Sequence, residues 1–427
     1  MKSFEYEPVF KKTILDNGVR VVTEHHPYCR GVSAGITLDL GTRDEPAEMS
    51  GAAHFVEHLV FKGTETRDAY EIVKSLEAVG GELNAYTTRE QTCFHSTSLK
   101  EHLPLALDVL TDLMSNATFD VGDVKKEREV IIQEIKMSSD QTDDYIYDVF
   151  FANVYKNNDL SRSILGTPKT LNSMSRSKIF DFYNRRYHGH NMIVSVAGHV
   201  EHEFVVDLVR RTLSLRRKPF QAPLRKRPQF TNFAKAITRP GEQVHFLMST
   251  PSCGVKDPLR FASYIVNAAL GGGMTSRLYQ KVREQAGLSY SVFSHIQPFA
   301  DTGLMMLYAG TSAEHLKKVM SIILKEVERF YKKGLTVSEL DFFKRQVIGG
   351  YILESDDLEN RMNSIAFSEM TFGENRSVDY VIQEIEKVTP DQIQTYVKRY
   401  FDLNKLGLLV MGDCNEDRVT RELKKYI

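Results

Sequence analysis

The chain has 427 residues, of which 42% are hydrophobic and 26% charged, a balance typical of a folded protein with at least two domains. Its 55 Lys and Arg residues nearly balance 56 Asp and Glu residues, so net charge gives no reason to expect nucleic acid or membrane as partner. With no apolar secretory stretch at the N-terminus and no spanning segment, a cytoplasmic location is the expectation. Four scattered cysteines without CxxC spacing indicate neither a disulfide framework nor a thiolate metal site.

The first half of the chain begins in sheet. In TILDNGVRVVTEHH, two β-prone runs flank Asp16-Asn17-Gly18, which predicts a hairpin. The residue pattern then predicts, in order, a strand near Val32–Leu40, helices near Gly51–Phe61 and Ala69–Val79, strands near Glu82–Thr88 and Thr92–Ser98, and long helices near Glu101–Ser115 and Val121–Met137. This order indicates an α+β fold and not a regular βαβ alternation.

The second half repeats this order of elements. It predicts a strand near Val244–Ser249, helices near Leu259–Leu270 and Arg277–Gln285, strands near Ser289–Ile296 and Gly303–Ala309, and then two long helices. Local sequence agrees, because SLKEHLPLALDVLTDL resembles TSAEHLKKVMSIILKEV. We therefore expect an internal duplication: two homologous α/β domains, each a mainly antiparallel sheet packed with helices.

A proline-containing basic run, Arg216–Phe230, separates the halves. We expect a catalytic zinc-binding domain at 1–215, a linker at 216–240 and a homologous domain without metal at 241–427. The basic run could contact nucleic acid, but short charged linkers are usually solvated, so no role is predicted for it.

The segment GAAHFVEHLVFKGT carries the residues of a metal site. His54 and His58 are four apart on a predicted helix, so both imidazoles project from one face, with Glu57 beside them. A hydrolytic zinc site needs three protein ligands, an open position for water and a base next to that water. The pattern supplies two ligands and the base, although HFVEH could also arise by accident on an ordinary amphipathic helix.

The third ligand should be a carboxylate on another element. The segment KKEREVIIQEIKM contains Glu127, Glu129 and Glu134. Glu127 and Glu134 are seven residues apart, which is two helical turns, so both lie on one face. Either could face the metal.

Three blocks, GAAHFVEHLVFKGT, GGELNAYTTREQTCF and EREVIIQEI, resemble the pitrilysin family of zinc peptidases, whose inverted motif is HxxEH. The resemblance extends along essentially the whole chain and is strongest to the branch that includes the β subunit of the mitochondrial processing peptidase and its bacterial relatives. It implies one Zn²⁺ per chain, held by His54, His58 and Glu134, with Glu57 as the base. Glu127 would be the nearby acidic residue that orients a ligand.

The resemblance also implies roles for the second half. Arg283 and Tyr290, in KVREQAGLSYSVF, match an arginine and a tyrosine that hold substrate and stabilise the oxyanion. Ser263, Val266 and Asn267 stand where the first half has its metal motif, so no second metal site is expected. The run LGGGMTSRL lacks the lysine of a phosphate loop and resembles a glycine-rich substrate loop. The family implies a clam-like homodimer enclosing a chamber, in which each chain offers Arg283 and Tyr290 to its partner's zinc.

These residues predict a zinc-dependent endopeptidase that cleaves peptides or unfolded segments. An extended peptide would add to the strand near Glu82–Thr88, where Asn84 would help to hold it. By resemblance, Asp144 and Asp148, ten and fourteen positions after Glu134, would receive a basic substrate side chain near the cleaved bond. The alternative is a noncatalytic scaffold or partner subunit of a heteromeric processing peptidase. Neither nucleic acid nor membrane is expected as a partner.

Overall fold

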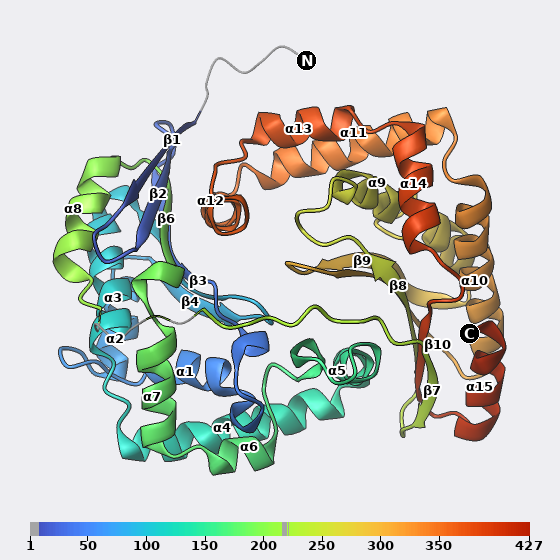
Figure 1. Cartoon of the computed structure of the whole chain (residues 1–427), viewed down its shortest axis with the longest axis horizontal. Coiled ribbons are helices and arrows are strands. Elements are labelled where there is room, and N and C mark those ends of the chain that lie inside the picture. Colours follow the sequence, from blue (N-terminus) through green and yellow to red (C-terminus); the bar gives the residue numbers. More distant parts are fainter. Residues whose placement is uncertain (1–7, 216–219, 221) are drawn as a thin grey trace. The chain divides into compact units, whose positions relative to one another are not determined.

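Figure 1 shows the structure, a computed structural model that describes residues 8–215, 220 and 222–427. The first seven residues, and residues 216–219 and 221 of the predicted linker, lie outside the described residues. The chain divides into two compact units, each built from three segments. The first unit comprises Met1–Ile135, Ser163–Arg225 and Leu353–Arg376, and the second comprises Lys136–Arg162, Lys226–Ile352 and Ser377–Ile427.

The first unit contains a six-stranded sheet in the order β1-β2-β6-β3-β5-β4. Its strands are β1 (Val9–Ile14), β2 (Arg20–His25), β3 (Gly31–Leu38), β4 (Glu82–Thr87), β5 (Thr92–Leu99) and β6 (Met192–Gly198). All neighbours pair antiparallel except β2 and β6. The hairpin of β1 and β2 turns at Gly18, whose φ of 88° favours glycine. Among the described residues, strand β4 forms one edge of the sheet.

Helices cover both faces of this sheet. The helices of the first unit are α1 (Ala52–Val60), α2 (Ala69–Glu77), α3 (Leu103–Asn116), α4 (Val121–Asp140), α6 (Pro168–Ser173), α7 (Arg176–Arg186), α8 (His202–Thr212) and α12 (Leu358–Phe372). The last residues of α4, from Lys136, belong to the second unit. The main core lies between the sheet and α1, α3, α7 and α8. Helix α12 packs over β2, β3 and β6, with Ile365 against Val22 and Ile193. Every residue of β6 is buried as a result.

The second unit contains a five-stranded sheet in the order β7-β11-β8-β10-β9. Its strands are β7 (Phe233–Thr238), β8 (Val244–Ser252), β9 (Ser289–Pro298), β10 (Gly303–Thr311) and β11 (Gly407–Gly412). Its helices are α5 (Thr142–Val154), α9 (Arg260–Leu270), α10 (Leu316–Lys333), α11 (Val337–Glu354), α13 (Val378–Glu386), α14 (Pro390–Tyr400) and α15 (Glu416–Leu423). Helix α5 covers one face of this sheet through Ile146 and Phe150, and the larger core lies on the other face. The predicted helix at Arg277–Gln285 is a π-helical turn over Tyr279–Glu284.

The two sheets share one topology. Read from β2, the first sheet runs β2-β6-β3-β5-β4, and the second runs β7-β11-β8-β10-β9. The single parallel pair stands at the same place in both, because β2 pairs with β6 and β7 with β11. The predicted α+β class, with two mainly antiparallel sheets packed with helices, is confirmed.

Each compact unit takes one covering helix from the other half of the sequence. Helix α5 precedes the linker but packs on the second sheet, whereas α12 follows the linker but packs on the first. The units are therefore discontinuous, unlike the uninterrupted domains 1–215 and 241–427 expected from the sequence. Strand β7 also falls inside the stretch 216–240 predicted as linker. Among the described residues, we find no helix with the length and apolar character needed to cross a bilayer.

Candidate zinc centre

Helix α1 carries His54, Glu57 and His58. Its apolar side chains, including Phe55, Val56 and Leu59, are fully buried and orient the helix against the core. The residues four apart therefore project together from the opposite face, as the spacing predicts.

The start of α1 is stabilised by a residue distant from the helix itself. The N-cap residue is Gly51, which has φ of 94° and no side chain to bind the free N–H groups of the first turn. Glu45 supplies that contact, because its two carboxylate oxygens accept from the N–H of Gly51 at 2.9 Å and of Ala53 at 2.7 Å. A side chain at Gly51 would bring its Cβ within 2.8 Å of the Leu165 carbonyl oxygen. The Glu45 hydrogen bonds and the close packing of Gly51 against Leu165 thus fix the backbone just before His54.

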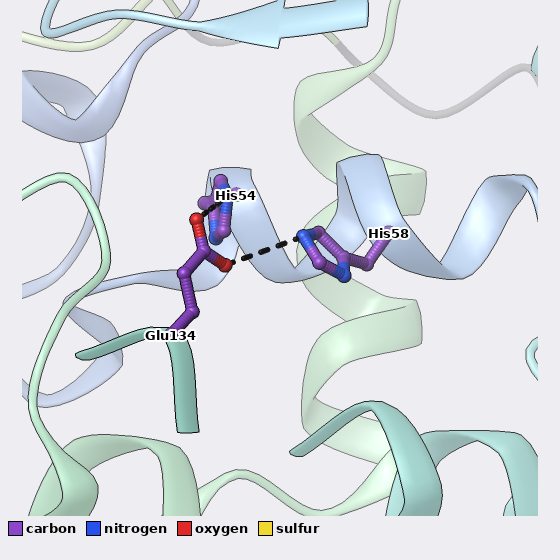
Figure 2. A group of neighbouring side chains, drawn as sticks. All are labelled: His54, His58 and Glu134. Atoms are coloured by element: carbon purple, nitrogen blue, oxygen red, sulfur yellow. Dashed lines mark ion pairs between the residues drawn. The ribbon is translucent and has the colours of Figure 1, made fainter. Parts of the chain in front are cut away.

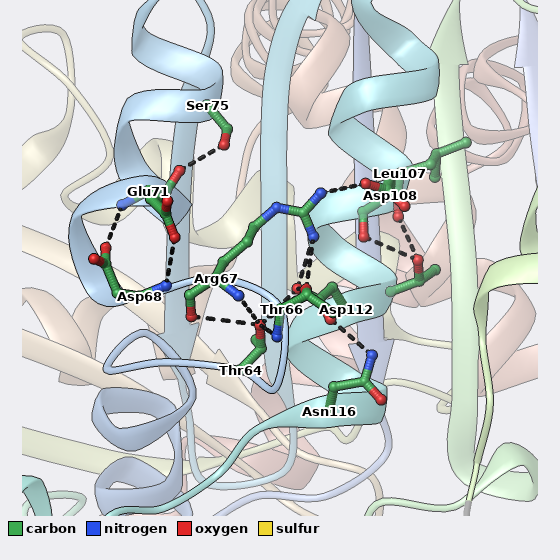
Figure 3. A network of polar contacts seen from close by, with 11 residues as sticks. Thr64, Thr66, Arg67, Asp68, Glu71, Ser75, Leu107, Asp108, Asp112 and Asn116 are labelled. Atoms are coloured by element: carbon green, nitrogen blue, oxygen red, sulfur yellow. Dashed lines mark hydrogen bonds and ion pairs between the residues drawn. The ribbon is translucent and has the colours of Figure 1, made fainter.

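The segment after α1 is also anchored. Figure 3 shows that Asp112 of α3 accepts hydrogen bonds from Thr64 at 2.7 Å and from Thr66 at 2.8 Å, and pairs with Arg67 at 2.7 Å. Burial raises the pKa of Asp112, but hydrogen bonds, including those from Asn116 and Thr64, outweigh it and lower that pKa overall. A charged, fully bonded carboxylate therefore ties the exit of the zinc-motif helix to the core.

Glu134 of α4 lies opposite the two histidines. Figure 2 shows one carboxylate oxygen directed to each imidazole: Oε1 lies 3.8 Å from His54 Nε2, and Oε2 lies 3.7 Å from His58 Nε2. One ligand atom from each residue can be chosen so that all three lie within 4.8 Å of one another. Two imidazole nitrogens and one carboxylate oxygen are a donor set that suits zinc and leaves a fourth position open. Within the described part of the chain, these are the only His, Cys, Asp and Glu residues grouped in this way.

The electrostatics of the cluster favour metal binding. Burial, with a smaller contribution from His58, lowers the pKa of His54 to about 3, so this imidazole is neutral and has a lone pair to donate. Burial raises the pKa of Glu134, while His58 opposes the rise. A divalent cation would offset the cost of burying this carboxylate.

Glu57 lies beside the cluster and not in it. Burial raises the pKa of Glu57, as does the charge of Glu134, whereas a hydrogen bond from Thr87 and the charge of His58 oppose the rise. The Thr87 hydroxyl donates to Glu57 Oε2 at 2.5 Å. A half-buried carboxylate with an elevated pKa is better suited to accept and return a proton than an ordinary glutamate.

Glu127 contacts the far side of the His58 ring. Its Oε2 lies 3.1 Å from His58 Nδ1, and its Oε1 pairs with Lys62 Nζ at 3.0 Å. With Nδ1 engaged, Nε2 is the nitrogen that faces Glu134. This is the arrangement expected of a residue that orients a ligand from outside.

The predicted oxyanion residues belong to the second unit. Arg283 donates to the Tyr290 carbonyl oxygen at 3.0 Å, and its guanidinium lies over the rings of Tyr279 and Tyr290, at 4.9 Å and 4.3 Å from their centroids. Tyr290 is 77% exposed. Both residues line a cavity of about 400 Å³ beside edge strand β9, and the glycines of the predicted loop, Gly271–Gly273, line it too.

The predicted substrate-binding residues divide between the units. Asn84 is exposed on edge strand β4, and its side-chain oxygen accepts from the Ala85 N–H at 2.8 Å. Asp144 is exposed and Asp148 half-buried on α5 of the second unit. Neither aspartate lies in the compact unit that holds Glu134.

Sequence reasoning missed Glu45 and Thr87, which lie next to the motif only in space. It also gave the linker no role, yet Arg225 there lies against the first unit. Its guanidinium bonds the Asp44 carboxylate at 2.8 Å and 2.7 Å and Asp39 at 2.7 Å. The residues next to Arg225 in the sequence give no indication that it pairs with Asp39 and Asp44.

Comparison with known proteins identifies the family. Residues 20–168 match the family model "Insulinase (Peptidase family M16)", and residues 173–347 match the model "Peptidase M16 inactive domain". The chain belongs to peptidase family M16. An uncharacterized zinc protease of Mycobacterium leprae is 37% identical over 97% of this M16 chain and 94% of its own length. The uncharacterized zinc protease YmxG of Bacillus subtilis is 33% identical over 92% of this chain and 96% of its own.

Solved structures agree with the M16 fold. A protease from Helicobacter pylori superposes with a TM-score of 0.88 at 21% identity, covering 95% of this chain and all (100%) of the other. A structure described as a peptidase M16 inactive domain from Pseudomonas fluorescens also gives 0.88, at 16% identity, with 95% and 98% coverage. At such identities the likeness shows the fold alone. The names of the sequence relatives support a peptidase role and suggest zinc as the metal.

Proposed function

We propose that this M16 chain is a zinc-dependent endopeptidase whose metal is held by His54, His58 and Glu134 and whose base is Glu57. The convergence of two imidazole nitrogens and one carboxylate oxygen within 4.8 Å, with both histidines on the anchored helix α1, carries the proposal. Zinc bound there would polarise the scissile carbonyl and make a coordinated water more acidic. The protein must then orient the peptide and move one proton.

Glu57 performs the proton transfer. Its carboxylate takes a proton from the attacking water and later gives it to the leaving amine, a double use that suits a carboxylate with an elevated pKa. Glu127 keeps the His58 ring in place through Nδ1 throughout. Glu57 therefore takes part in the reaction itself, whereas Glu127 only orients a metal ligand.

The peptide would bind in extended form along edge strand β4. Backbone hydrogen bonds give affinity with little dependence on sequence, and the exposed Asn84 stands on that strand. Peptides or unfolded segments fit this mode, because a folded protein rarely offers a free strand. The resemblance to the processing-peptidase branch adds a preference for basic residues near the cut, received by Asp144 and Asp148.

Arg283 and Tyr290 would stabilise the oxyanion from a second copy of the chain in a homodimer that encloses a chamber. Both residues line one cavity, which supports a shared role. Guanidinium and phenol groups aimed at a developing negative charge contribute to rate in the transition state.

The test compares wild type with Glu57→Gln, using metal content and hydrolysis of a quenched basic peptide with and without chelator. Both proteins should bind one zinc per chain, and turnover should fall by roughly 10²–10⁴-fold in the variant, the usual contribution of a general base. Glu77→Gln, at an exposed carboxylate on α2, should leave both readings unchanged.

Three results separate the alternatives. Chelator-sensitive cleavage in wild type alone supports the endopeptidase. Stoichiometric zinc without cleavage by the dimer favours a subunit that needs a different partner. A wild type that binds no zinc would overturn the proposed function.

A further inference from the structure

Thr87 is the last residue of edge strand β4. Because side chains alternate along a strand, Thr87 shares a face with Leu83 and Ala85, and these two residues pack against the core that contains α1. Asn84 and Tyr86 take the other face, where the Tyr86 hydroxyl bonds Asn363 of α12 at 3.0 Å. Thr87 therefore points toward the zinc-motif helix.

In the Thr87–Glu57 hydrogen bond, the threonine hydroxyl is the donor. The Thr87 hydroxyl lies 2.5 Å from Glu57 Oε2, and an ionised carboxylate can only accept. Across the sheet, Thr92 is paired with Thr87, and their hydroxyl oxygens are 3.5 Å apart. The buried Thr92 hydroxyl donates to the Leu40 carbonyl at 2.9 Å, so it could only accept from Thr87. The Glu57 oxygen lies closer to Thr87, at 2.5 Å against 3.5 Å for Thr92, so the Thr87 proton goes to Glu57.

A base on a long side chain needs a fixed orientation. Glutamate has three side-chain torsions, and rotation about them would move its carboxylate away from a nearby water. One oxygen held by Thr87 leaves the other as the proton acceptor.

We propose that Thr87 is a positioning residue that holds the Glu57 carboxylate in its working orientation and links it to the strand that receives the peptide. This inference rests on the proposed function, since it assigns Glu57 the role of base. Peptide addition along β4 would then act on the same strand that positions the base, so binding and base orientation would share one element.

The first arm of the test distinguishes the effect of the Thr87 hydroxyl from the effect of the shape of its side chain. Thr87→Val keeps the branched shape without the donor, and Thr87→Ser keeps the donor. Valine should lower kcat by about 10–100-fold, the effect of losing a hydrogen bond to a charged group, with KM and zinc content unchanged. Serine should restore most of kcat, and Thr395→Val, at an exposed threonine of α14, should equal wild type.

The second arm measures the Thr87–Glu57 contact through its effect on stability, without an activity assay. In metal-free protein, thermal midpoints are compared for wild type, Thr87→Val, Glu57→Gln and the double variant. If the two side chains interact, the thermal midpoint of the double variant should fall by clearly less than the sum of the decreases in the two single variants.

The two arms distinguish failure of the Thr87 inference from failure of the proposed function. Wild-type kcat in Thr87→Val, additive midpoints, or serine as impaired as valine would each overturn the inference. If wild type itself fails to cleave while the midpoints are non-additive, the proposed function fails and the Thr87–Glu57 contact is still supported.

Discussion

At the residue scale, His58 lies between two glutamates, one at each nitrogen of its ring. Glu127 contacts its Nδ1 at 3.1 Å, and Glu134 approaches its Nε2 at 3.7 Å. Both glutamates lie on one face of α4, two turns apart, so their spacing alone could not choose between them. Only Glu134 also reaches His54, which makes it the bridging carboxylate.

Substitution should separate the two roles. Glu134→Gln should abolish stoichiometric zinc binding, because the neutral amide is a poor ligand at a site with only three donors. Glu127→Gln should retain zinc but weaken its affinity by roughly 10–100-fold, the usual effect of losing an outer partner. Competition with a fluorescent chelator measures both, with the exposed Glu129→Gln as control. Weaker zinc binding in Glu127→Gln than in Glu134→Gln would reverse the assignment.

At the scale of the element, α1 is a nine-residue helix that depends on its surroundings. So short a helix is marginal by itself, and its N-cap is a glycine without a capping side chain. The Glu45 carboxylate satisfies two N–H groups and places negative charge at the positive end of the helix dipole. Zinc affinity should therefore depend on a residue that never touches the metal.

Glu45→Gln tests this dependence. The amide keeps one acceptor but loses the charge, so the free energy of unfolding should fall by about 1–2 kcal/mol, as for loss of a helix cap. Zinc affinity should fall in parallel, because His54 directly follows the residue whose N–H is bound. Denaturant titration of metal-free protein and chelator competition measure the two effects. Glu48→Gln, at an exposed carboxylate nearby, is the control, and equal stability of the two variants would contradict the capping role.

At the scale of the whole molecule, α12 joins the first unit although it lies far along the sequence. Arg361 of α12 forms a bidentate pair with Glu24 of β2, at 2.8 Å and 2.6 Å, and both side chains are only 3% exposed. Glu369 of the same helix pairs with Lys12 at 2.8 Å. Charge pairs therefore add to the apolar contacts of Ile365 in holding α12 against the first sheet.

The Glu24 pair should make stability depend on pH. Burial raises the pKa of Glu24, but hydrogen bonds and charges from His26 and Arg361 outweigh it and lower the pKa from 4.5 to about 2. A lowered folded-state pKa stabilises the fold above the unfolded pKa, so this contribution should be complete above about pH 4.5 and disappear as pH falls toward 2.

Glu24→Gln should remove that pH dependence and reduce neutral stability by roughly 3–5 kcal/mol, the cost of breaking a buried pair. Thermal unfolding midpoints across the acid range, with the exposed Glu101→Gln as control, provide the measurement. An unchanged acid profile in Glu24→Gln would show that the pair does not hold α12 in solution.

The sequence by itself determined what depends on local pattern. Helical spacing placed His54 and His58 on one face with Glu57 beside them, and the repeated order of strands and helices predicted two similar sheets. Resemblance of three short blocks then singled out Glu134. These features are readable because periodicity and motif spacing are carried by neighbouring residues.

Only the tertiary structure decided which distant groups meet. An apolar helix face does not say which sheet it will cover, so the exchange of α5 and α12 could not be read from the chain. Glu45, Thr87 and Arg225 are ordinary polar residues in sequence, and their partners lie on other elements. Their contacts follow from the packing of the whole fold, because a hydrogen bond depends on where two groups come to rest and not on how they are spaced along the chain.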